Sequence, residues 1–188
     1  MKQLLSSLAL AATLALGAHA HAALVTFDQP GLIEIDPNTN VATYREAGSV
    51  LTGEAATFLP LDGVGSGGSG GLFVLGAGQI LTLTAESGDP FTLLSIDYGG
   101  FDPNAGGELT VEAFTANASF SQTLSLGALQ TFLFAGLSGL TEVRFSATAD
   151  LVLDNLNTVP EPVSLALVLA ALTGLGGLRQ RRQHAVAA

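Results

Sequence analysis

The sequence predicts an all-β fold, an antiparallel jelly-roll-like β-sandwich, with a signal helix before it and a single transmembrane helix after it. Residues 24–158 contain short extended runs in which apolar and polar residues alternate, spaced by about 8–12 residues with turn signals between them. No helical periodicity of useful length appears between the two ends of the chain. The composition agrees, because 23 glycines and only 12% charged residues favour an exported β domain over a helical enzyme.

Ten runs carry the alternation, which predicts a sandwich of eight or more strands. Turn signals separate them, for example at residues 36–40 (DPNTN) and 88–90 (GDP). Residues 63–71 (GVGSGGSGG) hold no extended run and predict a flexible loop or linker. The expected strands are residues 24–27, 32–35, 41–44, 80–85, 91–98, 109–114, 120–126, 131–135, 143–147 and 151–156.

The N-terminus has the features of a secretory signal peptide. A positively charged start precedes an apolar run over residues 4–16, which is too short to span a bilayer. Small residues follow the run, and Ala18, Ala20 and Ala22 provide two A-x-A cleavage sites. We therefore expect signal peptidase to remove a segment within residues 1–23.

The C-terminal part begins with the motif Val159-Pro160-Glu161-Pro162. Neither proline can enter a helix interior, and each biases the residue before it toward an extended form. Glu161 is therefore expected on an extended, exposed segment that a processing protease can bind.

An uncharged apolar run over residues 163–178 follows the motif and ends at a basic cluster of Arg179, Arg181 and Arg182. As a helix, its sixteen residues would reach about 24 Å, and snorkelling arginines would let it span the membrane with mild mismatch. The basic cluster predicts that the extreme C-terminus lies in the cytoplasm and the central domain outside.

The order of Pro-Glu-Pro motif, short apolar helix and arginine cluster resembles the PEP-CTERM sorting signal, also catalogued as an ice-binding-protein-type C-terminal domain. The resemblance implies recognition by an exosortase, cleavage near the motif, and a link to exopolysaccharide or biofilm in Gram-negative bacteria. It also implies a membrane-anchored precursor that ends at the cell surface or in the extracellular matrix. The expected organisation is a signal peptide (1–23), an extracellular β-sandwich (24–158), the sorting signal (159–183) and a cytoplasmic tail end (184–188).

The central domain is strongly acidic. Of six basic residues, only Arg45 and Arg144 lie between the terminal segments, whereas all 16 acidic residues lie between Asp28 and Glu161. This charge argues against nucleic acid and other anionic polymers as partners. Cysteine is absent, which removes thiol catalysis and thiolate metal sites.

The stretches FTLLSIDYGG, AGLSGLTEVRFSA and LVLDNL, within residues 91–156, resemble the exported jelly-roll domains of many PEP-CTERM proteins, which look like carbohydrate-binding-module sandwiches. In such modules an Asp of the last strand, in an L-D-N setting, binds a structural calcium ion. The resemblance implies Asp154 for that role, with Asp28 and Asp150 as companions. Calcium takes six to eight oxygen ligands, and the spacing of these residues is not diagnostic. The favoured interpretation is therefore that Asp154 is a solvated edge-strand residue, or one that caps a turn, with no cofactor.

Catalysis is not expected. The histidines, His19, His21 and His184, lie in or beside the terminal segments, so a Ser-His-Asp site in the central domain is implausible. Glycosidase chemistry needs one specific pair of carboxylates, and no pair stands out among the acids. The absence of Trp and the presence of only two Tyr argue against a sugar-stacking cleft.

The sequence therefore predicts a non-catalytic surface or matrix protein, sorted by an exosortase and associated with exopolysaccharide. The alternative is a carbohydrate-binding module, with or without a structural calcium ion. A small glycosidase or lyase is the third hypothesis.

Overall fold

The computed structural model describes residues 22–29 and 33–161. In this part of the chain the fold is all β, with 13 strands, one 3-10 turn (Ser66–Gly68) and no α-helix. The strands are β1 (Ala23–Val25), β2 (Ile33–Asp36), β3 (Val41–Glu46), β4 (Ser49–Glu54), β5 (Phe58–Leu61), β6 (Gly71–Val74), β7 (Ile80–Ala85), β8 (Phe91–Gly100), β9 (Glu108–Thr115), β10 (Ser119–Ser125), β11 (Gln130–Leu133), β12 (Leu140–Ala147) and β13 (Leu151–Pro160). The predicted all-β class is confirmed.

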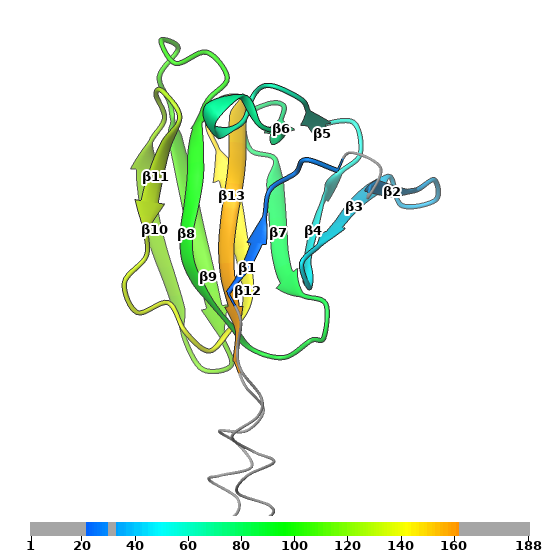
Figure 1. The fold of residues 1–188 in the computed structure, drawn as a ribbon, viewed down its shortest axis with the longest axis vertical. Coiled ribbons are helices and arrows are strands. Elements are labelled where there is room, and N and C mark those ends of the chain that lie inside the picture. Colours follow the sequence, from blue (N-terminus) through cyan, green and yellow to red (C-terminus); the bar gives the residue numbers. More distant parts are fainter. Residues whose placement is uncertain (1–21, 30–32, 162–188) are drawn as a thin grey trace, which may run out of the picture. The chain divides into compact units, whose positions relative to one another are not determined.

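The strands form a two-layered antiparallel β-sandwich. One layer has the order β2-β3-β4-β7-β12-β9-β10. The other has the order β11-β8-β13-β6-β5, and β1 lies beside the second half of β13. A single residue pair, Leu140 with Phe91, joins the two layers into one continuous hydrogen-bonded sheet. Figure 1 shows β13 flanked by β8 and β1.

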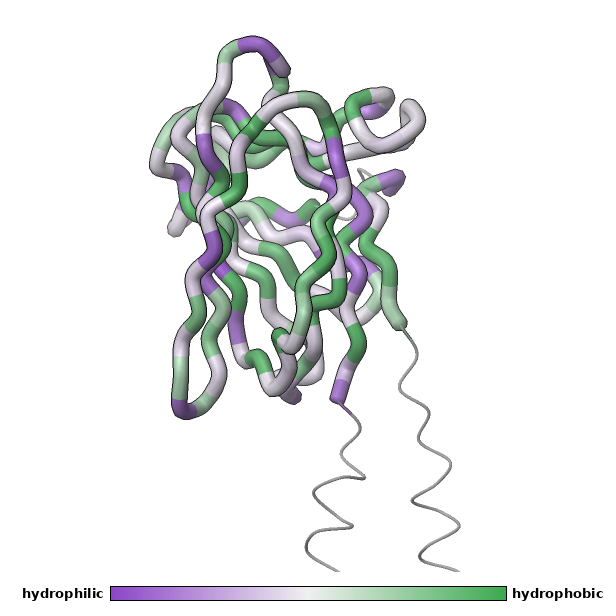
Figure 2. Tube along the Cα trace, turned by 90° about the vertical axis from the view of Figure 1, so that its left-hand side faces the viewer, coloured by the Kyte–Doolittle hydropathy of each residue, from purple (hydrophilic) through white to green (hydrophobic). Residues whose placement is uncertain are grey.

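The hydrophobic core lies between the layers and consists of alternate residues of each strand. On β9, Leu109 and Val111 are buried while the residues beside them are more exposed. Leu151 and Leu153 of β13 belong to the same core from the opposite layer. Figure 2 shows this alternation of hydrophobic and hydrophilic residues along the chain. Successive side chains of a strand point to opposite faces, so the period of two in the sequence places every second residue in the core.

Three strands were missing from the sequence prediction, namely β4, β5 and β6. β5 and β6 are short, with four residues each, and each of the three strands contains a residue that weakens a strand pattern: Gly53, Pro60 or Gly71. Pro60 is tolerated because β5 lies at an edge of its layer. The prediction of a loop at residues 63–71 is confirmed as far as residue 70, and Gly71 begins β6. The linker alternative is wrong, because this segment folds against β13.

Several predicted features lie outside the described residues. Among them are the apolar run at the N-terminus and the predicted membrane helix at 163–178. Within residues 22–29 and 33–161, none of the structure is a helix with the length and apolar character needed to cross a membrane. The individual residues that lie outside are Ala18, Ala20, Pro162, Arg179, Arg181 and Arg182.

Candidate functional site

The predicted sorting motif, residues 159–162, begins inside the sandwich. Val159 and Pro160 are the last two residues of β13, and they pair with the first two residues of β8. Val159 is half-buried, Pro160 is exposed, and Glu161 is half-buried beyond the end of the strand. The motif therefore leaves the domain at the end of β13, and its first half belongs to the paired strands of the fold. Glu161 is half-buried and not exposed as the sequence predicted.

A buried carboxylate lies on the outer face of β13, beneath the glycine-rich loop at residues 63–71. Asp154 is 0% exposed, and β13 has paired strands on both sides, so the interpretation of Asp154 as a solvated edge-strand residue is wrong. Its Oδ2 accepts hydrogen bonds from the backbone N–H of Ser66 at 2.7 Å and from the hydroxyl of Ser69 at 3.0 Å. Burial raises the pKa of Asp154, and the charge of the neighbouring Asp97 carboxylate raises it further. The hydrogen bonds from Ser66, Ser69 and the Asn155 N–H act in the opposite direction and lower the pKa. The loop thus supplies the donors that make burial of this acid tolerable.

Asp97 of β8 lies directly across from Asp154 in the strand register and is also buried, at 7% exposed. The side-chain amide of Asn155 joins the two acids, since its Nδ2 donates to Asp97 Oδ2 at 2.8 Å and to Asp154 Oδ2 at 3.1 Å. The hydroxyl of Thr131 donates to the other oxygen of Asp97. Asn155 has a left-handed backbone (φ 45°) at a register shift of β13, which lets its side chain reach both acids. The arrangement is a hydrogen-bonded clamp between strands and loop.

The three predicted calcium residues do not form one group. Asp28 accepts a hydrogen bond from the Gly70 N–H at 2.7 Å, so it contacts the same loop as Asp154. Asp150 instead accepts from the Gly76 N–H at 2.8 Å, in the turn between β6 and β7. Among the described residues, no three His, Cys, Asp or Glu side chains are grouped closely enough to hold a metal ion. The sequence reasoning missed Asp97, because the register between β8 and β13 has no signature in the sequence.

Close backbone approach explains the glycines of this loop. A Cβ on Gly65 would lie 1.9 Å from the Gly70 carbonyl oxygen and 2.6 Å from Asp154 Oδ2. A Cβ on Gly70 would lie 2.5 Å from the carbonyl oxygen of Phe27. Both positions therefore require glycine so that the loop can reach the carboxylates.

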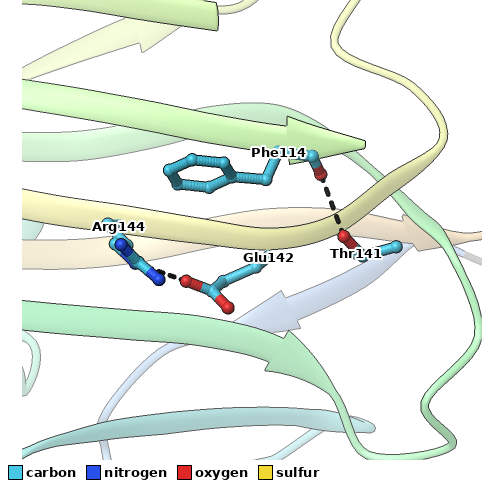
Figure 3. A network of polar contacts seen from close by, with 4 residues as sticks. All are labelled: Phe114, Thr141, Glu142 and Arg144. Carbon is cyan, nitrogen blue, oxygen red and sulfur yellow. Dashed lines mark hydrogen bonds and ion pairs between the residues drawn. The ribbon is translucent and has the colours of Figure 1, made fainter. Parts of the chain in front are cut away.

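A second polar network lies on the outer face of the opposite layer, as Figure 3 shows. The Arg144 Nε forms an ion pair with Glu142, and its guanidinium carbon lies 4.8 Å from the ring centroid of Phe114. The hydroxyl of Thr141 donates to the backbone oxygen of Phe114 at 3.3 Å. Arg144 is exposed, so the pair contributes little to stability and forms a polar surface rather than a cavity.

A groove lies between β10 and β11, at the edge where the two layers separate. Its volume is about 360 Å³ and its lining contains no charged residue. Phe120 of β10 lines one side, and Phe132 and Phe134 line the other, with their two rings in an edge-on contact at 4.9 Å. Val111 and Ala113 of β9 also line it. The sequence did not predict this groove. Its lack of Trp and its two Tyr argued against a sugar-stacking cleft, and the pattern of its ten Phe residues does not show which of them lie close together in the fold.

No known protein family matches the sequence, and no curated protein matches it either. Several solved structures resemble the fold distantly. The CBM22-1 and GH10 modules of endo-1,4-β-D-xylanase 10B from Clostridium thermocellum, complexed with xylohexaose, are 12% identical with a TM-score of 0.41, covering 61% of this chain and 26% of that one. TmCBM61 in complex with β-1,4-galactotriose is 10% identical with a TM-score of 0.40, covering 60% and 88%. The family 11 carbohydrate-binding module of Clostridium thermocellum, in complex with a β-1,3-1,4-mixed-linked tetrasaccharide, is 11% identical with a TM-score of 0.39, covering 76% and 97%. The chain thus spans about a quarter of the xylanase, and likeness at this level assigns neither a family nor a ligand.

Proposed function

We propose that this chain is an exported, non-catalytic protein of the cell surface or extracellular matrix, whose domain is separated from its sorting tail by an exosortase. The observation that carries the proposal is the extent of the compact unit, whose described residues begin at Ala22 and end at Pro160. Ala22 lies two residues after the predicted signal-peptidase site at Ala20, and Pro160 lies within the predicted sorting motif. Cleavage at both sites would leave the strands of the sandwich in place.

The first and last strands of the domain also lie side by side in the fold. Ala23 of β1 pairs with Thr158 of β13, so the entry and the exit of the domain are neighbours on one layer. A domain whose two ends emerge side by side can be held at the membrane by either terminal segment in turn. This supports a membrane-anchored precursor that is exported first and processed afterwards, with signal peptidase and exosortase as successive partners. We also propose that the two antiparallel layers form a jelly-roll-like sandwich.

The state of the carboxylates supports a non-catalytic role. Asp97 and Asp154 form a close pair, but both are buried and hydrogen-bonded to loop and strand donors. Glycosidase chemistry requires two carboxylates that face a sugar and a water molecule across an open site. This pair holds the fold together and does not face such a site.

A second candidate function is carbohydrate binding, and the groove between β10 and β11 is the observation that favours it. Three aromatic side chains, Phe120, Phe132 and Phe134, line a hollow without charged residues. Ligand sites are concave and mostly apolar with few polar groups, as this groove is. Association with exopolysaccharide in the matrix is the setting in which such a groove would act.

The experiment that tests the first proposal is the intact mass of the protein recovered from cells and from medium, with and without the candidate exosortase. We expect a mature form that begins between His21 and Ala23, ends near the motif, and is lost without the exosortase. Glu161→Ala should block the second cut, whereas Glu54→Ala, at an exposed position far along the chain, should not. A mass that retains residues 163–188 in both strains would overturn the proposal and leave the tail as a simple anchor.

A further inference from the structure

The groove between β10 and β11 exists because the sandwich does not close over aromatic residues that point inward. On β10, Leu124 is in the core and 6% exposed, whereas Phe120, four residues earlier on the same face, is 49% exposed. On β11, Phe132 pairs with the buried Ile96 of β8 and so shares its inward face. In the described part of the chain β10 pairs with β9 and β11 pairs with β8, so both strands are layer edges that face each other across the groove.

The lining of the groove excludes charged ligands. It contains no acidic or basic side chain, although the domain around it carries many acids and only two arginines. A cation or an anion would therefore lose its hydration there without gaining a partner of opposite charge. Gln122, two residues after Phe120 on the same face of β10, provides an uncharged hydrogen-bonding side chain at the groove. The ligand that matches is neutral, with an apolar face and a polar rim.

We propose that this groove binds a segment of a neutral glycan. A pyranose ring has a C–H face that packs on the exposed Phe120 ring and hydroxyl groups around it that can donate to the Gln122 side-chain oxygen. An acyl chain would make no use of this amide. A peptide strand would pair with an edge backbone and would not need three phenylalanine walls. The volume of about 360 Å³ lies at the lower end of ligand pockets, which fits a short segment of the polymer. The inference rests on the second candidate function, carbohydrate binding at this groove, and deepens it by naming a neutral glycan as the ligand.

The test is isothermal titration calorimetry of the full chain, kept in a zwitterionic detergent whose headgroup is not a sugar. The probes are cellohexaose, laminarihexaose and mannohexaose, with hexagalacturonate as the anionic probe of equal length. We expect at least one neutral hexasaccharide to bind, and hexagalacturonate not to bind. Phe120→Ser should weaken that binding about tenfold or more, a loss typical of one anchoring aromatic contact.

Phe101→Ser is the matched control, because Phe101 is 52% exposed and contacts Phe73, away from the groove. It should bind as the wild type does. If Phe120→Ser does not fold, the affinity of Gln122→Ala for the hexasaccharide is the test, and we expect it to fall several-fold. The inference would be overturned if binding were unchanged in the groove variants or equally lost in Phe101→Ser. It would also be overturned if no neutral hexasaccharide bound, or if only an extended apolar peptide did. The proposed processing is tested separately by mass, so either idea can fail while the other stands.

Discussion

The carboxylate of Asp154 accepts a hydrogen bond at 2.7 Å from the backbone N–H of Ser66, 88 residues earlier in the chain. The bond ties the glycine-rich loop to the last strand, on the outer face of the sandwich. Because Asp154 is fully buried, its ionised form depends on the donors that the loop provides. The loop is therefore part of the folded structure, and the stability of the domain should respond to changes on either side of this contact.

Burial raises the pKa of Asp154, which gives its contribution to stability a defined pH dependence. A raised pKa means that the folded state holds the proton more tightly than the unfolded state. This contribution is fully present below the unfolded-state pKa of about 3.9 and is lost as the pH rises through the folded-state pKa. Asp154→Asn removes the titration. The free energy of unfolding of the wild type should thus fall relative to that of Asp154→Asn as the pH rises through this window.

Urea unfolding of both proteins, at a series of pH values from about 3 upward, measures this difference. The variant loses hydrogen bonds from Ser66 or Ser69 at every pH, so its absolute stability is not the readout. The prediction concerns how the difference in free energy of unfolding between the wild type and Asp154→Asn changes with pH. A difference that does not change with pH, or that grows in favour of the wild type as pH rises, would contradict the prediction.

Gly65→Ala should destabilise the domain strongly. The new methyl group would overlap the Gly70 carbonyl oxygen and press on Asp154 Oδ2, so the loop would have to move off the clamp. We expect the free energy of unfolding to fall by about 3 kcal/mol, the upper part of the usual range for overpacking. Gly127→Ala is the matched control, since its Cβ would meet nothing within 4 Å and its backbone needs no positive φ. Urea unfolding should separate the two, and equal effects would show that crowding at Gly65 is not the cause.

The strands with strong alternation could be predicted from the sequence, and those interrupted by special residues could not. Residues 91–98 and 151–156 were predicted as strands and lie within β8 and β13. β5 was missed because Pro60 lacks a donor, yet pairing with β6 holds it in place. Local pattern decides the first kind of strand, while pairing with distant residues decides the second.

The candidate site was predictable only in part, for a related reason. Asp154 was singled out from its L-D-N setting, and the structure places it in a buried clamp. Its partner Asp97 was not, because only the register between β8 and β13 makes the two neighbours. The groove needed the same kind of information, since Phe120 and Phe132 come from edge strands of different layers. Contacts across layers follow from tertiary pairing, which a single sequence does not display.

Glu46→Gln should loosen the N-terminal segment. The Glu46 Oε2 accepts hydrogen bonds from the backbone N–H groups of Thr26 at 2.9 Å and Phe27 at 3.1 Å, and from the Tyr44 hydroxyl at 3.0 Å. Burial raises the pKa of Tyr44, and the hydrogen bond from its hydroxyl to Glu46 and the charge of Glu46 raise it further. Glutamine has one side-chain oxygen and no charge, so some of the groups on Thr26, Phe27 and Tyr44 that donate to Glu46 would lose their acceptor. We expect a loss of about 2 kcal/mol in the free energy of unfolding.

Hydrogen exchange at the Thr26 and Phe27 amides, together with urea unfolding, checks this expectation. Exchange should speed up at both amides in Glu46→Gln. Glu54→Gln, at an exposed end of β4, is the control and should leave both measurements as in the wild type. Unchanged protection of the two amides in Glu46→Gln would mean that β1 is held by its pairing with β13 alone.

The position of the Val159-Pro160-Glu161-Pro162 motif at the end of β13 predicts where the tail can be cut without damage to the domain. Thr158 is buried and its hydroxyl lies 3.3 Å from that of Ser49, on the opposite layer. A chain that ends at Pro162 keeps this contact and the pairing of Pro160 with Phe91, so it should unfold at the same urea concentration as the full chain. A chain that ends at Asn157 loses both and should be less stable by about 3 kcal/mol. Equal stability of the two shortened chains would show that the last residues of β13 are dispensable. A marked difference would mean that a protease acting at the motif must cut after Pro160, because a cut before it would remove residues on which the fold depends.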